Sequence, residues 1–178
     1  MNRFNQKKIF MVDYLIFRKT RTARSLVFNR FALPLVNYYR EFFKGKKIPW
    51  GESRHSLSRF KKGSLGNEMS LFLTKNGFEL NPKMESHDAF HVITGYGTEM
   101  HEEAAMQFFL IGNRKKSKLA RISALVGFVI FPEYWKLYLA SYRRGKETLH
   151  FSSWNFKEML LADLHKFRKD IKLPERKL

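Results

Sequence analysis

The sequence contains no cysteine. A disulfide framework, a thiolate metal site and a cysteine nucleophile are therefore excluded. Any metal ion bound by this chain would have to be held by histidine, aspartate or glutamate, which are also ligands of divalent metals. A metal site is therefore expected only where these residue types gather.

Acidic residues are scarce. The 178 residues include 34 Lys and Arg against 16 Asp and Glu, a net charge of +18. Such a balance favours an anionic partner, which would be a phospholipid surface, a phosphorylated substrate or nucleic acid. Plain solubility is the competing explanation. Nucleic acid is the least favoured partner, because the chain has neither zinc-finger spacing nor an aromatic RNP stretch.

Long hydrophobic runs are lacking as well. The most apolar part, residues 122–142, has an unbroken run of about ten residues, whereas roughly 20 are needed to span a bilayer. It predicts a buried helix that is kinked or restarted at Pro132. The first residues have neither the longer apolar run nor the small-residue cleavage site of a signal peptide, so none is expected.

Alternation of apolar and polar residues is nearly absent, while apolar residues recur at helical spacing. Hydrophobic residues make up 44% of the chain and aromatic ones 16%, enough for a folded core. We therefore predict an all-α, single-domain helical bundle over residues 1–178, with basic helices in 1–45 and a motif-bearing core at about 60–112. Residues 147–154 are ambiguous, and a short strand at 148–152 is one interpretation of them. A final amphipathic helix is predicted over 156–172.

The strongest functional signal is the run His87, Asp88 and His91, followed after eleven intervening residues by Glu103. Residues four apart share one face of a helix, so both imidazoles would point the same way, with Asp88 beside them. Two glycines in the following segment would end this helix and let the chain turn back. The resulting helix-turn-helix would aim His87, Asp88, His91 and Glu103 at one space.

Thr98 is placed to cap the second of these helices. Four nitrogen and oxygen ligands suit a divalent metal, zinc first, with iron, manganese or magnesium as alternatives. A lone H-x-x-x-H also arises by chance, and it is the adjoining carboxylates that strengthen the prediction. Glu99, His101 and Glu102 crowd the same segment, and for them surface solvation is the competing explanation.

The H-D-x-x-H run with Glu103 eleven residues later resembles the metal-binding motif of the coenzyme Q (ubiquinone) biosynthesis protein Coq-four family. Glu85 also falls where that family usually has an acidic residue. The resemblance covers about residues 60–112, although the family often has a longer segment with an R-Y pair before the motif. Further similar segments, in family order, are Gly63-Ser64-Leu65-Gly66, Phe72-Leu73, Asn76-Gly77-Phe78 and His91-Val92-Ile93-Thr94-Gly95.

This resemblance implies a metal-dependent role in coenzyme Q biosynthesis on a prenylated aromatic lipid or isoprenoid. The implied step removes or replaces the C1 carboxyl group of the precursor. The implied metal ligands are His87, Asp88, His91 and Glu103, and among them Glu103 is the candidate catalytic group. A non-catalytic scaffold that binds the prenyl lipid is the alternative. Candidates to support the ligands or to transfer protons are Glu99, His101 and Glu102.

The same resemblance implies partners and a location. The expected partners are an anionic membrane surface, other quinone biosynthesis proteins and a second copy of the chain. In a bacterium the protein would be cytoplasmic and peripheral to the inner face of the cell membrane. The alternative location is the matrix side of the mitochondrial inner membrane.

Overall fold

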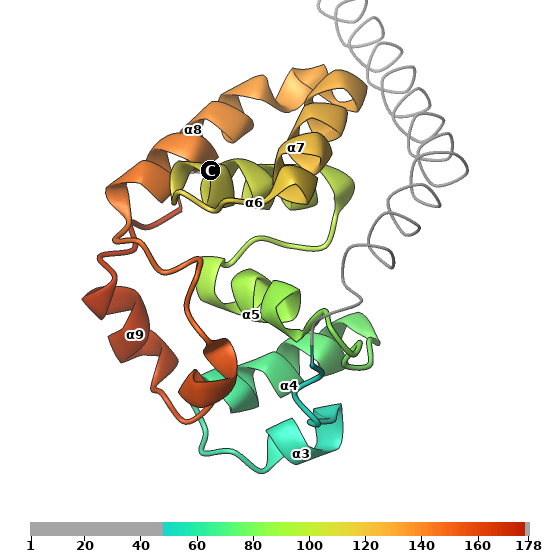
Figure 1. Ribbon diagram of the computed structural model, residues 1–178, viewed down its shortest axis with the longest axis vertical. Coiled ribbons are helices and arrows are strands. Elements are labelled where there is room, and N and C mark those ends of the chain that lie inside the picture. The colour runs from blue at the N-terminus through green and yellow to red at the C-terminus, as the bar shows by residue number, and fades with distance from the viewer. Residues whose placement is uncertain (1–47, 177–178) are drawn as a thin grey trace, which may run out of the picture. The chain divides into compact units, whose positions relative to one another are not determined.

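The computed structural model describes residues 48–176, and their regular structure is entirely helical (Figure 1). No strand forms within these residues, where pairing of the β type is limited to an isolated antiparallel bridge between Ser64 and Asp163. The all-α prediction is thus confirmed, whereas the basic helices predicted in 1–45 lie outside the described residues. The elements are α3 (Arg54–Ser58), α4 (Leu65–Asn76), α5 (Glu85–Thr94), α6 (Met100–Gly112), α7 (Lys118–Ile130), η2 (Pro132–Tyr134), α8 (Trp135–Glu147), η3 (Phe156–Met159) and α9 (Leu164–Asp170).

Helix α6 packs against both α7 and α8, and small residues set how closely the backbones approach. A Cβ atom on Gly145 of α8 would lie 2.0 Å from the carbonyl oxygen of Phe109 in α6. A Cβ atom on Gly127 of α7 would lie 2.3 Å from the Cβ of Ala104 in α6. Both distances are far below van der Waals contact, so a hydrogen atom alone fits at each crossing.

Phe151 is the centre of the aromatic core. Its side chain is fully buried and lies 6.1 Å, between ring centroids, from Phe109 of α6 and 6.0 Å from Phe167 of α9. It also contacts Phe90 of α5 and Phe156 of η3, at 6.2 Å in each case. One ring therefore joins the two helices of the predicted motif to the carboxyl-terminal part of the chain.

Asn113, which follows α6, organises the segment where a strand was predicted. Its buried side-chain amide donates to the carbonyls of Thr148 and Leu149, both at 3.1 Å, and its side-chain oxygen accepts from the N–H groups of Phe151 and Ser152, also at 3.1 Å. The strand at 148–152 is thus a wrong prediction. Its backbone groups are bound to one asparagine side chain instead of to a neighbouring strand.

The single helix predicted over 156–172 is also wrong, because the chain is interrupted between η3 and α9. Asp163 caps α9 by accepting from the N–H of Lys166 at 2.8 Å. Just before it, the carbonyl of Ala162 accepts from the N–H of Leu65 at 2.9 Å, an interaction that holds the chain extended. Five apolar positions of this segment are nevertheless buried in the core, namely Phe156, Leu160, Leu164, Phe167 and Ile171, whereas Leu161 is exposed.

The apolar segment after α6 forms two helices. The restart at Pro132 is confirmed, and α7 and η2–α8 are bent by 108° at the break. The predicted burial of α7 is wrong, since Leu125 is 63% exposed and Val129 68% exposed. Within residues 48–176, the length and hydropathy expected of a bilayer span are reached by this bent pair taken together and by no helix on its own.

Candidate metal centre

Helix α5 ends where its sequence requires. Gly95 adopts a left-handed conformation with φ of +77° and donates its N–H to the carbonyl of His91 at 2.8 Å. Only glycine takes this conformation without a steric cost. On the inner side of α5, Ala89, Phe90 and Ile93 are buried in the core, and this anchoring leaves the two histidines facing the first turn of α6.

Helix α6 starts differently from the sequence-based prediction. Glu99 occupies the capping position, without a side-chain hydrogen bond to the helix. Thr98, the predicted cap, donates instead to the side-chain oxygen of Asn76 at 3.4 Å. Glu102 and Glu103 follow in the first turn, where the positive end of the helix dipole favours carboxylates.

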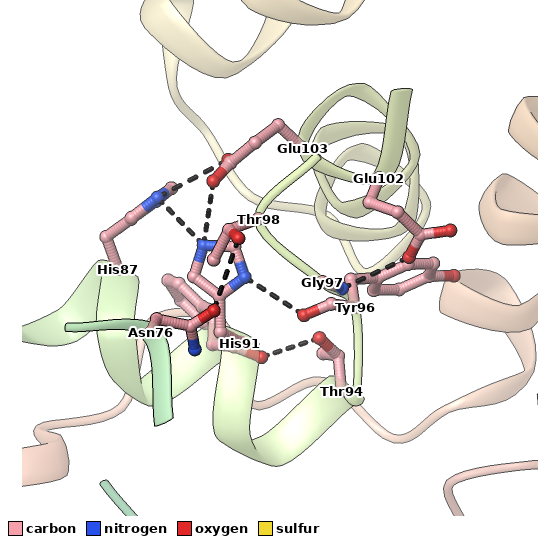
Figure 2. Close-up of polar contacts among 10 residues, drawn as sticks. Asn76, His87, His91, Thr94, Tyr96, Gly97, Thr98, Glu102 and Glu103 are labelled. Carbon is pink, nitrogen blue, oxygen red and sulfur yellow. Dashed lines mark hydrogen bonds and ion pairs between the residues drawn. The ribbon is translucent and has the colours of Figure 1, made fainter. Parts of the chain in front are cut away.

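The two helices bring His87, His91 and Glu103 together (Figure 2). The Nε2 atom of His91 lies 3.0 Å from one carboxylate oxygen of Glu103, and the Nε2 atom of His87 lies 3.4 Å from the other. The two Nε2 atoms are 3.1 Å apart. One ligand atom from each residue thus lies within 4.8 Å of the other two, and the predicted convergence of these three side chains is present.

The electrostatics of this cluster depend on mutual contact. Burial by itself would raise the pKa of Glu103, but hydrogen bonds from His87 and His91, together with their charge, lower it to about 2. Burial would lower the pKa of His91, yet the hydrogen bond and charge of Glu103 raise it on balance. A metal ion requires neutral imidazoles and an ionised carboxylate, so metal binding at this cluster would compete with protonation of the histidines.

Two neighbours hold His91 in place. Its Nδ1–H donates to the backbone carbonyl of Tyr96 at 3.1 Å, and this bond leaves the Nε2 lone pair directed at the cluster. The ring of Phe72 in α4 stacks on it at 5.2 Å between centroids. Sequence reasoning missed both: a backbone carbonyl carries no sequence signal, and Phe72 was noted only as part of a family segment.

Asp88 lies beside the cluster without entering the group of three. Burial raises the pKa of Asp88 to about 6. The positive charge of His87 and His91 acts to lower this pKa, and the negative charge of Glu103 and Glu85 acts to raise it. The carboxyl group is therefore in electrostatic reach of the histidines. Its role as a fourth ligand stays a prediction.

The three other residues of the predicted site have their own surroundings. Glu99 is exposed. His101 stacks on Tyr134 of η2 at 4.2 Å between centroids. Glu102 accepts from the N–H of Gly97 at 3.1 Å and pairs with Arg176, and Figure 2 shows its side chain reaching away from the histidines.

Three arginines from the second half of the chain hold the carboxyl end of α5. Arg168 donates to the carbonyls of Val92 and Ile93, at 2.7 and 3.0 Å. Arg144 donates to Thr94 at 2.9 Å, and Arg176 donates to Gly95 at 3.0 Å as well as to Glu102. Helix ends leave such carbonyls without intrahelical partners, and cations stabilise that end of the dipole. This three-arginine clamp, formed by Arg144, Arg168 and Arg176, lies 50 to 81 residues further along the chain than the carbonyls it binds.

The donor set fits a divalent metal. Ligand atoms about 2.0–2.1 Å from a tetrahedral zinc ion are roughly 3.3–3.4 Å apart. The two Nε2 atoms are 3.1 Å apart, and they lie 3.0 and 3.4 Å from the two different carboxylate oxygens of Glu103. Two histidines and a carboxylate also suit non-haem iron(II). A site with these three protein ligands would keep coordination positions open for water or substrate, as catalytic metal sites do, and the predicted fourth ligand, Asp88, would occupy one of them.

Comparison with known proteins adds a similar fold. The structure resembles the crystal structure of a protein from Nostoc punctiforme PCC 73102 that bears the name "Putative ubiquinone biosynthesis protein", with a TM-score of 0.59. The similarity covers 97% of this chain and 91% of that one, at 15% sequence identity, and it shows a shared fold. No family model and no curated protein matches the chain.

Proposed function

We propose that His87, His91 and Glu103 bind one divalent metal ion, zinc before iron, manganese or magnesium. The observation that carries this proposal is the convergence of two imidazole nitrogens and a carboxylate oxygen from adjacent helices, within 4.8 Å of one another. The bond from His91 to Tyr96 supports it, because ligating histidines characteristically donate their second N–H to a backbone or carboxylate oxygen. A metal bound there would act as a Lewis acid or activate a coordinated water.

The proposed process is ubiquinone biosynthesis, in which this chain would act as a Coq-four-like protein. Support comes from the H-D-x-x-H…E motif resemblance and from the fold shared with the Nostoc punctiforme protein. The proposed substrate is a prenylated aromatic precursor, and the proposed step removes or replaces its C1 carboxyl group beside the metal. The proposed location is the inner face of a bacterial cell membrane or the matrix side of the mitochondrial inner membrane, together with other quinone biosynthesis proteins.

The residues of this chain have distinct proposed tasks in that step. His87 and His91 hold the cation, and Glu103 contributes a negative charge that its lowered pKa preserves. Asp88 has a pKa of about 6, near enough to neutrality for its carboxyl group to release or take up a proton next to the ligands. It is therefore the better candidate for proton transfer than Glu102, which is paired with Arg176.

A second candidate function is a non-catalytic scaffold that binds the precursor through the metal and hands it to other enzymes. The specific observation in its favour is that His101 and Glu102, two of the predicted proton-transfer residues, are engaged by Tyr134 and Arg176. In that case the metal would hold the head of the lipid without turnover.

Metal content and conversion of the precursor test both functions on one set of proteins. We expect about one metal ion per wild-type chain, much less in His87→Ala, and wild-type content in His165→Ala, whose side chain is exposed on α9. Glu103→Gln should impair conversion of a prenylated hydroxybenzoate followed by mass spectrometry, while the exposed control Glu147→Gln should not.

The outcomes separate the proposals. A wild-type protein that contains no metal and gains no stability from added zinc refutes the metal site. Metal binding without conversion by any of the proteins, with metal and oxygen supplied, favours the scaffold. Full conversion by Glu103→Gln would remove that carboxylate from the chemistry.

A further inference from the structure

Helix α7 has an outer face that is apolar instead of polar. Its inner face consists of small buried residues that pack toward the core, among them Ala124 and Gly127. A helix at the surface of a soluble protein normally presents polar side chains outward. The outer face of α7 instead exposes Ile122 (45%), Leu125 (63%), Phe128 (42%) and Val129 (68%).

Positive charge is concentrated at one end of the same face. Lys118 and Arg121 are exposed and lie one turn before Ile122 and Leu125 on the helix surface. Exposed Arg114 and Lys116 precede them. The sequence between Glu103 and Glu133 contains no aspartate or glutamate, so this end is basic without a compensating acid in the same stretch.

Helix α8, which follows the bend at Pro132, also exposes apolar side chains next to basic ones. Trp135, Leu139 and Tyr142 follow one another at helical spacing and are 49%, 39% and 37% exposed. Lys136 and Arg143, also exposed, accompany them. Tryptophan and tyrosine have an apolar body and a polar tip, the combination found at the boundary between water and lipid.

We propose that the outer face of α7, Ile122, Leu125, Phe128 and Val129 with Lys118 and Arg121, docks this protein on an anionic lipid bilayer. The charge of the face favours a bilayer over the other partners that could cover it. A second copy of the chain carries a net charge of +18 and would be repelled by the basic end of α7. The chain's own residues 1–47 contain only Asp13 and Glu41 as acids among many lysines and arginines, and would be repelled as well.

An anionic bilayer satisfies both parts of the face. Its headgroups attract basic side chains, and its acyl region accepts apolar ones to a depth of about 5–10 Å, as for helices that lie in the plane of the interface. α7 would lie on the membrane and not cross it. This docking face rests on the membrane location proposed above, but it is distinct from the ligand cluster and needs no bound metal.

The absence of cysteine makes a direct test possible. Leu125→Cys and, as a matched control, Leu161→Cys, whose native side chain is 76% exposed in the segment after η3, each provide a single labelling site for an environment-sensitive dye. The full chain is mixed with vesicles of phosphatidylcholine, with or without phosphatidylglycerol. We expect the dye at position 125, and not that at 161, to report a less polar environment on the anionic vesicles only, with a response that weakens as salt rises.

Flotation of unlabelled variants completes the experiment. Leu125→Gln with Val129→Gln should lower partitioning onto anionic vesicles by about tenfold or more, from the lost apolar burial. Lys118→Gln with Arg121→Gln should lower it about fivefold for each cation removed at low salt. Exposed cations of α9 provide the control pair, Lys166→Gln with Lys169→Gln, which should float like wild type.

Several results would overturn the proposal. One is an equal response of the two dyes; another is equal flotation of wild type and Leu125→Gln with Val129→Gln. A dye at position 125 that is shielded without vesicles and becomes exposed on dilution would assign the face to a second copy. Shielding that persists on dilution but disappears when residues 1–47 are removed would assign it to that segment. Resistance to extraction by high salt and alkali would mean that the bent pair is embedded in the membrane.

Discussion

Arg176 is predicted to control metal affinity although it is not a ligand. Its guanidinium donates to the carbonyl of Gly95, pairs with Glu102 and lies 4.6 Å from the centre of the Tyr96 ring. The carbonyl of Tyr96 in turn accepts the Nδ1–H of His91 at 3.1 Å. Replacing Arg176 with glutamine removes the charge and the double contact that hold this loop, so the orientation of His91 becomes less restricted.

The expected loss of metal affinity depends on which contacts still hold His91 in Arg176→Gln. Removing a group that orients a metal ligand typically costs 10–100-fold in affinity. Arg144 still holds Thr94 at 2.9 Å, and Phe72 still stacks on His91, so the loss should lie near the lower limit, about tenfold or about 1.4 kcal/mol. Arg176→Lys, which keeps the charge but not the fork of donors, should fall between the two proteins.

Competition of the protein with a zinc-binding dye at pH 7 measures this difference. The control is Arg143→Gln, an exposed position on α8 next to the clamp, which should bind zinc like wild type. Wild-type affinity in Arg176→Gln would refute the link from Arg176 through Tyr96 to His91. A melting temperature that falls without zinc, together with unchanged zinc affinity, would instead mean that Arg176 only stabilises the fold.

Three further predictions concern stability, each measured by urea denaturation of metal-free protein. Asn113→Ala removes a buried amide whose two N–H groups are shared among three backbone carbonyls and whose oxygen accepts from two backbone N–H groups. At about 1 kcal/mol for each of about four hydrogen bonds, the expected loss is roughly 3–4 kcal/mol, and a loss below about 1 kcal/mol would mean that water replaces the amide. Gly145→Ala forces α6 and α8 apart and should lower the free energy of unfolding by about 1–3 kcal/mol or more. The control Ser123→Ala on α7 should leave it nearly unchanged. Equal effects of the two substitutions would contradict the close approach of α8 to α6 at Gly145. Burial raises the pKa of Asp88 from 3.8 to about 6 in the folded protein, so its contribution to stability is complete below pH 4 and is lost as pH rises through 6. Asp88→Asn should therefore lose less stability than wild type between pH 4 and pH 7. Parallel pH profiles of the two proteins would contradict the assigned shift.

Local patterns in the sequence determined the elements of the predicted motif. Spacing of four placed His87 and His91 on one face of α5, and glycine at position 95 ended that helix. The interval to Glu103 carried that carboxylate into the first turn of α6. These features depend on a few neighbouring residues and on backbone geometry, and the sequence contains all of that information.

Capping and interruption were harder to predict, because each is a competition between a local preference and a distant partner. Thr98 had the chemistry of a cap, but its hydroxyl is bound to Asn76. The apolar spacing of residues 156–172 was typical of one helix, yet the contact between Leu65 and Ala162 breaks it. The strand predicted at 148–152 was overridden by a single asparagine after α6.

Other features were decided by the tertiary structure alone. The three-arginine clamp joins residues 50 to 81 positions apart, and no local pattern marks an arginine as the partner of a particular carbonyl. The outer face of α7 was also decided by the tertiary structure. Its hydropathy predicted a buried helix, but α6 packs against the small residues of α7, and the large apolar side chains of α7 are therefore exposed. A sequence determines which groups a helix carries and on which faces they lie. Which face is buried, and which charges meet which carbonyls, depends on how the whole chain packs, because these contacts form only when segments distant in the sequence are brought together.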